Sequence, residues 1–452
     1  MEKQAVLNLI TDLCKILAAQ KIDYCHWKSN AYLDRSASGD NDLDLLVSRK
    51  HAHSFAEILY SLGFKESLPP KPEKLPGVRD FYGYDQETGK LIHVHAHFQL
   101  ILGNDLSKNY CLPLESVYLE SSLQGDLFRV PIPEFELVVL VIRMVIKHST
   151  WDAILMRHGQ LSNTERHELN DLSTDETLSK VEPILLHFPG LSQGLFDLCL
   201  QSIQLDCPIA TRIKAGRQLQ QVLRASSRRS RGIDILLKFS RRIWYPILWH
   251  GFRYEPKNHF ATGGLLIAIV GGDGAGKTTV INELHSWLSQ NHEVKKLHVG
   301  KPAWSWMTVI IRGILKIGTI LHLYSFEGDI YEESFQPHGI PWFIRAVTTA
   351  RDRYLTYIQA RRLSSNGKLV LCDRYPLSGF MKMDGPQCKD ALSRSKKTSR
   401  FLKFLISKEE FYYRQIQLPD LLIVLKADPE IAVQRKVDET ELSVRARSTE
   451  VW

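Results

Sequence analysis

The chain has 452 residues, of which 44% are hydrophobic, 24% charged and 10% aromatic. This length predicts two or three domains, and the composition excludes a disordered chain, a collagen-like fibre and a small disulfide scaffold. The formal net charge of +8, from 58 basic and 50 acidic side chains, fits phosphate-bearing ligands without requiring a nucleic-acid partner.

Cysteine usage and hydropathy indicate the cellular location of the protein. The seven cysteines are odd in number and form no CxxC pair, so we expect no disulfide framework and a reducing, cytoplasmic location. The first 19 residues combine an early acid with an amphipathic pattern, which is not typical of a signal peptide. The most apolar stretch, residues 304–324, is interrupted by Arg312 and Lys316, so we expect no membrane-spanning helix.

The predicted elements begin with a helix over residues 2–19, where apolar side chains recur every three or four positions. Four β-like runs follow, at residues 24–29, 43–47, 79–84 and 91–100. With a helical stretch near residues 51–62 between them, they predict a small α+β unit. Residues 134–250 read as almost entirely helical. Beyond residue 258, β-like runs alternate with helical patterns, which argues for a parallel α/β sheet with flanking helices.

Two aspartates mark the first candidate site. Asp42 and Asp44 lie two positions apart at the start of a β-like run, so their side chains point to one face. Two carboxylates on one face repel each other unless a cation lies between them, so this spacing predicts a divalent metal site. Upstream, Ser29 is a candidate ligand for a triphosphate, and Lys28 is a candidate to assist it.

This pattern resembles the DNA polymerase β-type nucleotidyltransferases over about residues 20–150. That family has a glycine-serine turn, a short spacer and then Asp-x-Asp, and here Lys28-Ser29 replaces the glycine-serine pair. The resemblance implies a mixed sheet and metal-dependent nucleotidyl transfer with Mg²⁺ or Mn²⁺ at Asp42 and Asp44.

The family's third acid is expected from a neighbouring strand. The best candidate strand carries His93, His95 and His97 on one face instead, and His95 takes the third-acid position as a predicted metal ligand. Imidazole suits Mn²⁺ or Zn²⁺ better than Mg²⁺. Two alternatives are histidines bonded to carbonyl groups on a sheet face and a separate three-histidine zinc hydrolase site. The helix that follows offers three further side chains to complete the pocket, Glu134, Glu136 and His148.

The strongest motif is a phosphate loop over residues 271–278, which fits GxxxxGK[ST]. It follows the apolar run 265–270 and precedes a helical pattern, as such a loop requires. The glycines let backbone N–H groups turn toward phosphate oxygens, Lys277 is expected to bridge the β- and γ-phosphates, and Thr278 is expected to hold Mg²⁺. The motif predicts a site for ATP or another nucleoside triphosphate.

A second acidic position lies downstream, where the buried-strand run 368–372 ends in Asp373 and Arg374. Ligands bind at this edge of parallel sheets. We expect Asp373 to position a Mg²⁺-bound water and Arg374 to grip a phosphate, the alternative being a surface ion pair.

Segments 273–279, 350–353, 373–379 and 419–430 together resemble thymidylate kinase, over about residues 264–452. The resemblance implies that Asp273 contacts the 3′-hydroxyl of the acceptor sugar, and that Arg353 and Arg374 hold the monophosphate or base. It also implies a basic lid made of Arg435, Lys436, Arg445 and Arg447. Thr349 stands where that family stacks an aromatic side chain on thymine. The predicted nucleotide-binding residues here are Gly271, Asp273, Gly274, Gly276, Lys277, Thr278, Thr279, Arg353, Arg435 and Arg445.

A basic segment joins the two candidate sites. Residues 212–242 carry ten Lys or Arg and one acid, and Trp244, Tyr245 and Trp249 follow. The segment reads either as a solvated helix face with a linker or as a patch that faces phosphate or a membrane surface.

Taken together, these features predict a multidomain chain of α/β and α+β class. We expect a nucleotidyltransferase core over residues 1–112, a helical subdomain and basic connector over 113–257, and a thymidylate kinase-like P-loop domain over 258–452. The kinase would phosphorylate a nucleoside monophosphate such as dTMP. The transferase would join a nucleotidyl group to a hydroxyl, making a thymidine-containing nucleotide or signal.

Other interpretations stay open. Similar fusions of a transferase with a kinase resemble components of bacterial antiviral defence. One alternative is a nucleotide sensor with little or no turnover. Another is an enzyme that activates a sugar or lipid phosphate in surface-polysaccharide assembly, with peripheral membrane contact. The sequence contains no motif that reads a nucleic-acid sequence.

Overall fold

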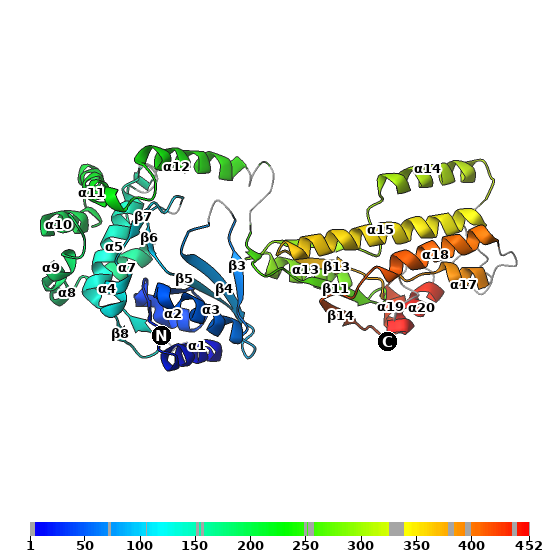
Figure 1. Ribbon diagram of the computed structural model, residues 1–452, viewed down its shortest axis with the longest axis horizontal. Helices are drawn as coiled ribbons and strands as arrows, with labels where there is room; N and C mark the ends of the chain where they lie inside the picture. Colours follow the sequence, from blue (N-terminus) through cyan, green and yellow to red (C-terminus); the bar gives the residue numbers. More distant parts are fainter. Residues whose placement is uncertain are drawn as a thin grey trace. The chain divides into compact units, whose positions relative to one another are not determined.

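The computed structural model describes residues 5–70, 74–104, 106–150, 153–154, 158–247, 251, 257–324, 339–377, 384–393, 399–435 and 441–451. The chain has a multidomain α/β fold, as predicted, and forms two compact units, Met1–Pro256 and Lys257–Trp452 (Figure 1). The α+β part and the helical part that follows it both belong to the first unit.

A mixed sheet is the centre of the first unit. Its strands run in the order β1 (Tyr24–His26), β2 (Leu43–Val47), β5 (Leu91–His97), β4 (Val78–Tyr84) and β3 (Lys65–Leu68). β2 and β5 are parallel, whereas the other neighbours are antiparallel. Apolar and polar residues alternate along β5, so Ile92, Val94 and Ala96 are buried in a core with α1 (Asn8–Ala19) and α3 (Ala52–Ser61). The histidines of β5 lie on the other face of the sheet.

The helical part of the first unit packs around α5 (Pro133–His148). A helix that is apolar on all sides is expected at the centre of a core, and α5 buries most of its side chains. The helices α7 (Asn163–Leu172), α9 (Val181–Leu185), α10 (Gln193–Ser202) and α11 (Ile209–Val222) contribute to the same core. The amphipathic helix α12 (Arg231–Pro246) follows them. Shorter elements are η1 (Asn30–Tyr32), α2 (Leu33–Ala37), η2 (Arg49–His51), β6 (Leu100–Leu102), β7 (Tyr110–Leu112), α4 (Glu115–Glu120), β8 (Leu123–Gln124), β9 (Arg129–Val130), α8 (Asp175–Ser179) and η3 (Leu223–Ser226).

The second unit contains a four-stranded parallel sheet. Its order is β12 (Val294–His298), β13 (Leu369–Asp373), β11 (Leu266–Gly271) and β14 (Leu421–Leu425). The central strands β11 and β13 are continuous apolar runs, as expected for strands covered on both faces. The long helix α15 (Ile340–Ser365) covers one face through Tyr357 and Ala360. The other elements are β10 (His259–Phe260), α13 (Lys277–Leu288), α14 (Trp306–Ile320), α17 (Cys388–Ser393), α18 (Arg400–Arg414), α19 (Pro429–Arg435) and α20 (Glu441–Val451).

Two predicted strands are wrong at their ends. The run 24–29 stops at His26, because Ser29 adopts a left-handed conformation with φ of 59° and a 3₁₀ turn begins at Asn30. The run 91–100 is two strands, since β5 ends at His97 and β6 begins at Leu100. Within the described part of the chain, no helix is both long and apolar enough to cross a bilayer.

Candidate functional sites

Neighbouring strands of the first unit bring the predicted metal ligands together. In the parallel pair of β2 and β5, Asp44 lies opposite His95. In the antiparallel pair of β4 and β5, Asp80 also lies opposite His95. The predicted strand thus carries its histidines between two acids, one on either side. Asp80 was not predicted, because nothing in the local sequence shows which residue of β4 lies opposite His95.

Asp44, His95 and His97 form a triangle of ligand atoms. Asp44 Oδ1 lies 3.2 Å from His95 Nδ1 and 3.6 Å from His97 Nε2, and the two nitrogens are 3.3 Å apart. These three groups can hold a metal ion. Donors around a tetrahedral ion with bonds of about 2.1 Å lie about 3.4 Å apart, whereas those around octahedral Mg²⁺ lie about 2.9 Å apart. The triangle therefore fits a tetrahedral ion such as Zn²⁺ better than Mg²⁺, as does its nitrogen-rich donor set.

Lys28 shares the Asp44 carboxylate with this triangle. Its Nζ lies 2.7 Å from Asp44 Oδ1 and over the ring of Trp27. Burial raises the pKa of Asp44, but the Lys28 ammonium and the hydrogen bonds with His95 and His97 outweigh it and hold this pKa well below its usual range. Asp44 is therefore ionised at neutral pH, as a metal ligand must be.

His93 has a different role from the other two histidines. Its Nδ1 lies 3.0 Å from Asp42 Oδ1 and its Nε2 lies 2.9 Å from Asp80 Oδ1. Burial lowers the pKa of His93, but these two hydrogen bonds outweigh it and raise the pKa to about 9. His93 is thus a cation that links two acids. By contrast, burial lowers the pKa of His97 to about 3 and leaves it neutral and able to ligate.

Asp42 was predicted to bind a metal together with Asp44 and His95, but it lies outside the triangle of Asp44, His95 and His97. Its side chain is 58% exposed and pairs with His93, whereas the Asp44 side chain is 14% exposed. The structure brings Asp44 and His95 together and adds His97 to them.

Two buried glutamates hold the turn after Lys28. The Ser29 N–H donates to Glu168 Oε1 at 3.0 Å, and the Asn30 N–H donates to Glu136 Oε1 at 3.4 Å. Burial raises the pKa of Glu136 to about 7. Glu136 was expected near this pocket, and His148 instead pairs with Glu165 at 3.1 Å. Glu168 was missed, because a polar residue on a polar helix gives no sequence signal.

The phosphate loop connects β11 to α13 in the second unit. Gly274 and Gly276 have φ of 79° and 86°, which favours glycine. The Lys277 ammonium donates to the carbonyl oxygens of Gly271 and Gly272, at 2.9 and 2.7 Å. Burial lowers its pKa, and the nearby Arg374 adds to this effect. Thr278 and Thr279 are exposed on the first turn of α13.

Three cationic side chains surround a buried carboxylate beside this loop. Asp273 is 2% exposed, and its oxygens lie 2.7 Å from Arg374 Nη2 and 2.7 Å from Arg447 Nη1. Lys277 Nζ lies 3.9 Å from the same carboxylate. Three cations around one anion leave an excess of positive charge, which suits a phosphate group.

Asp373 ends β13 at the same edge of the sheet. It lies opposite Ile269 of β11 and opposite His298 of β12, and its Oδ2 is 3.8 Å from His298 Nε2. The next residue, Arg374, has φ of 57°. A Cβ at Gly300 would come within 2.7 Å of Arg374 Cδ, so a glycine there gives the arginine its space.

The remaining predicted arginines differ in their contacts. Arg435 donates to the Gly274 carbonyl oxygen at 3.1 Å, so it touches the phosphate loop. Arg445 pairs instead with Glu430 and Glu441. Lys436 and residues 378–379 lie outside the described residues.

Arg353 is committed to internal contacts. Its five N–H donors are used by the Gly300 carbonyl, the Asp384 carbonyl and carboxylate and the Tyr413 hydroxyl, at 2.6 to 3.3 Å. An acceptor phosphate would have to displace one of these partners. Its role as a phosphate ligand stays a prediction.

Comparison with known proteins agrees with a nucleotide site. No family model matches the chain. The chain is similar to the "Uncharacterized ATP-binding protein YghR" of Escherichia coli K12, with 28% identity over 190 residues, which are 40% of this chain and 72% of YghR. It is also similar to YghS of the same strain, another "Uncharacterized ATP-binding protein", with 27% identity over 181 residues, or 38% and 73% of the two chains. This similarity and the phosphate loop both support nucleotide binding.

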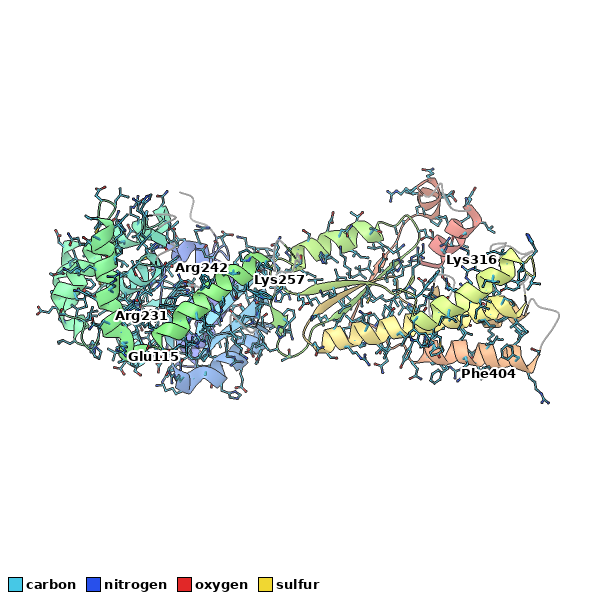
Figure 2. All side chains as sticks on the ribbon, turned by 90° about the horizontal axis from the view of Figure 1, so that it is seen from above. Glu115, Arg231, Arg242, Lys257, Lys316 and Phe404 are labelled. Carbon is cyan, nitrogen blue, oxygen red and sulfur yellow. The ribbon has the colours of Figure 1, made fainter. Side chains whose placement is uncertain are left out.

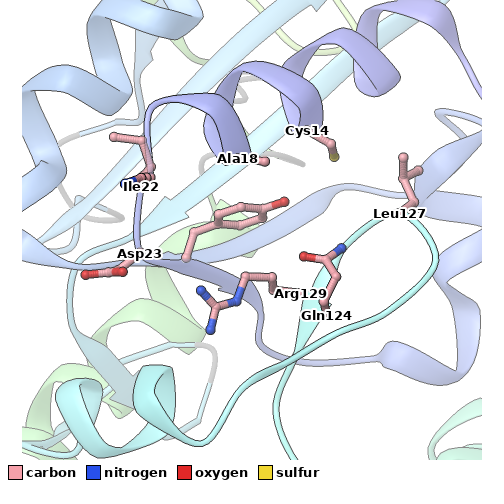
Figure 3. A pocket seen from close by; sticks show the side chains of 9 residues that line it. Cys14, Ala18, Ile22, Asp23, Gln124, Leu127 and Arg129 are labelled. Atoms are coloured by element: carbon pink, nitrogen blue, oxygen red, sulfur yellow. The ribbon is translucent and has the colours of Figure 1, made fainter.

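A small cavity lies elsewhere in the first unit (Figure 3). It has a volume of about 350 Å³ and is lined by the end of α1, the start of β1 and the β8–β9 turn, including Tyr24, Gln124 and Arg129. Its described lining contains none of the predicted site residues, so it does not belong to the candidate sites.

Proposed function

We propose that the chain transfers phosphorus-containing groups and has two nucleotide sites, one in each unit. The observation that carries the proposal is the group of Lys277, Arg374 and Arg447 around Asp273, next to a phosphate loop. The proposed reaction at this site is transfer of the γ-phosphoryl group of ATP to a nucleoside monophosphate.

The residues of the second unit suit this reaction. Backbone N–H groups of the loop would bind the β- and γ-phosphates, and Lys277 would exchange the carbonyl oxygens of Gly271 and Gly272 for phosphate oxygens. Asp273 orients Arg374 and Arg447, whose charges would stabilise the transferring group. When bound, Mg²⁺ neutralises phosphate charge, and Thr278 and Asp373 are the residues proposed to hold it or its water.

The test is phosphoryl transfer from γ-labelled ATP to dTMP, dUMP or dCMP by the full chain. We expect a labelled diphosphate product that Lys277→Ala reduces at least about a hundredfold. Arg414→Met is the control, because Arg414 is an exposed arginine on α18 that pairs with Glu410 and belongs to neither proposed site. ATP binding without transfer to any acceptor would overturn the kinase proposal and favour the nucleotide sensor.

A second activity, nucleotidyl transfer, is proposed for the first unit. The triangle of Asp44, His95 and His97 beside Lys28 supports it, because a group of side chains that could hold a metal lies next to a partly buried cation suited to phosphate. A divalent metal, when bound, would polarise the α-phosphate of a nucleoside triphosphate. Lys28 would bind triphosphate oxygens, and Glu168 and Glu136 would hold the Ser29–Asn30 turn in place.

Product analysis by mass spectrometry tests this activity. Metal-free protein would be given ATP and dTTP with Mg²⁺, Mn²⁺ or Zn²⁺. We expect a dinucleotide product with Mn²⁺ or Zn²⁺ that Asp44→Asn abolishes and Asp12→Asn, an exposed acid on α1, leaves unchanged. A product equally abundant in both variants would contradict the assignment.

A further inference from the structure

The helix α12 (Arg231–Pro246) lies on the first unit with its polar side inward. Asp234 is 6% exposed, and Lys238, which pairs with it at 2.7 Å, is 16% exposed. Arg241 donates to the Leu106 carbonyl oxygen. Just before the helix, Arg228 donates to the Lys108 carbonyl oxygen at 3.0 Å. These contacts fix which side of α12 faces the protein.

The opposite side of α12 is apolar and exposed. Its large side chains are 42% to 66% exposed and recur every three or four residues. They are Ile233, Leu236, Phe239, Ile243, Trp244 and, one residue beyond the helix, Ile247. Figure 1 shows α12 at the periphery of the first unit, and Figure 2 looks down on it between Arg231 and Arg242. A surface helix of a soluble domain normally has the reverse orientation.

The charge around this apolar face restricts what can cover it. Residues 212–242 carry ten basic side chains and one acidic side chain, and four of the basic ones are exposed: Lys214, Arg217, Arg224 and Arg231. Arg231 and Arg224 are exposed near the start of the helix. An apolar face with a tryptophan, next to a basic segment, has the composition of helices that lie in a membrane interface. Anionic lipid headgroups complement such a segment, and the acyl region accepts a convex apolar face without needing a matching groove.

We propose that α12 docks the protein on an anionic bilayer surface, with its apolar face in the interface and the exposed basic side chains before and at the start of the helix at the headgroups. The docking is peripheral, because the helix is too short to span a bilayer. It is independent of either proposed reaction.

Flotation of the full chain with lipid vesicles tests this proposal. The vesicles would be phosphatidylcholine alone or phosphatidylcholine with about 30% phosphatidylglycerol, whose anionic headgroups give the vesicle a negative surface potential. The variant Leu236→Ser/Phe239→Ser/Ile243→Ser removes three side chains from the exposed face. A matched control is Ile310→Ser/Ile314→Ser/Ile317→Ser on α14, where three side chains are similarly exposed but residues 304–324 carry only two basic residues.

We expect binding to the anionic vesicles only, weakened by salt. The α12 variant should lower the partition coefficient at least about tenfold, and the α14 control should retain binding. Three results would overturn the proposal: no binding by the unmodified chain, full binding by the α12 variant, or a concentration-dependent dimer that the α12 variant abolishes. The last would identify a second copy of the chain as the occupant.

Discussion

Three histidines on one strand have three different environments. His97 is almost fully buried against Trp27, His95 faces both Asp44 and Asp80, and His93 is a cation held between two acids. The alternation of a strand places all three on one face, but their chemistry depends on the acids that flank each of them. That difference allows the metal assignment to be tested one residue at a time.

The first prediction concerns metal affinity. His97→Gln removes one corner of the triangle and should weaken Zn²⁺ or Mn²⁺ binding at least about tenfold in isothermal titration calorimetry, because loss of a direct ligand costs no less than loss of an outer-shell partner. His93→Gln should have little effect, because His93 bonds to Asp42 and Asp80 outside the triangle. Equal losses in the two variants would contradict the assignment.

The second prediction concerns pH and Glu136. Burial raises the pKa of Glu136 in the folded protein to about 7, from 4.5. Between these values the folded state binds the extra proton, so stability falls as pH rises through this window. Glu136→Gln should remove this dependence and stabilise the first unit above pH 7, by about 3 kcal/mol at most.

Urea unfolding at several values between pH 4.5 and 8 measures this effect. The difference between Glu136→Gln and the unmodified chain should be near zero at pH 4.5 and grow toward pH 7. Glu134→Gln, on the same helix, is the control. A difference that does not change with pH would contradict the prediction.

At the scale of elements, α20, the last described helix, packs against the phosphate loop. A Cβ at Gly272 would come within 2.8 Å of Ser448 Cα, so the loop and α20 are in close contact there. Arg447 on the same helix reaches Asp273, whereas Arg445 pairs with Glu430 and Glu441. The proposed lid is therefore divided into a side that contacts the site and a side that does not.

The third prediction follows from this division. Arg447→Met should weaken ATP binding by about tenfold, since it removes a largely buried charge that contacts Asp273 beside the phosphate loop. Arg445→Met should change ATP affinity little, because its partners are exposed. Fluorescent nucleotide titration measures both. A larger effect in Arg445→Met would mean that the lid rearranges when ATP binds.

Helices, strands and loops were predictable from the sequence where neighbouring residues alone determine them. The phosphate loop is contiguous, so the sequence predicts strand, loop and helix in order, and the structure begins the helix at Lys277. β1 was predicted three residues too long, because the chain turns at Ser29, which has a left-handed φ, and the N–H groups of Ser29 and Asn30 donate to the distant Glu168 and Glu136. The place of Asp80 depends on strand register, which no single segment encodes.

At the scale of the whole molecule, the chain has two compact units, and one candidate site lies in each. The sequence predicted a multidomain α/β chain because periodicity changes along it. The sequence did not show that the apolar side of α12 is exposed, because this depends on the contacts that its polar side makes with the protein. Amphipathic periodicity alone does not tell which side of a helix faces the protein.

The fourth prediction is that each ligand protects its own unit. In hydrogen-exchange mass spectrometry, ATP with Mg²⁺ should slow exchange in residues 271–279 and in α20. Zn²⁺ or Mn²⁺ alone should slow exchange in β2 and β5. Lys277→Ala should remove the first effect and leave the second. Protection by ATP that is confined to the first unit would contradict the site assignment.

The central claim is that one chain has two nucleotide sites. Equilibrium dialysis with a non-hydrolysable ATP analogue in Mn²⁺ tests it most directly, using the full chain, Lys277→Ala and Asp44→Asn. The account predicts two analogues bound per unmodified chain and one per chain in each variant. A single analogue per unmodified chain, lost in Lys277→Ala and retained in Asp44→Asn, would contradict it.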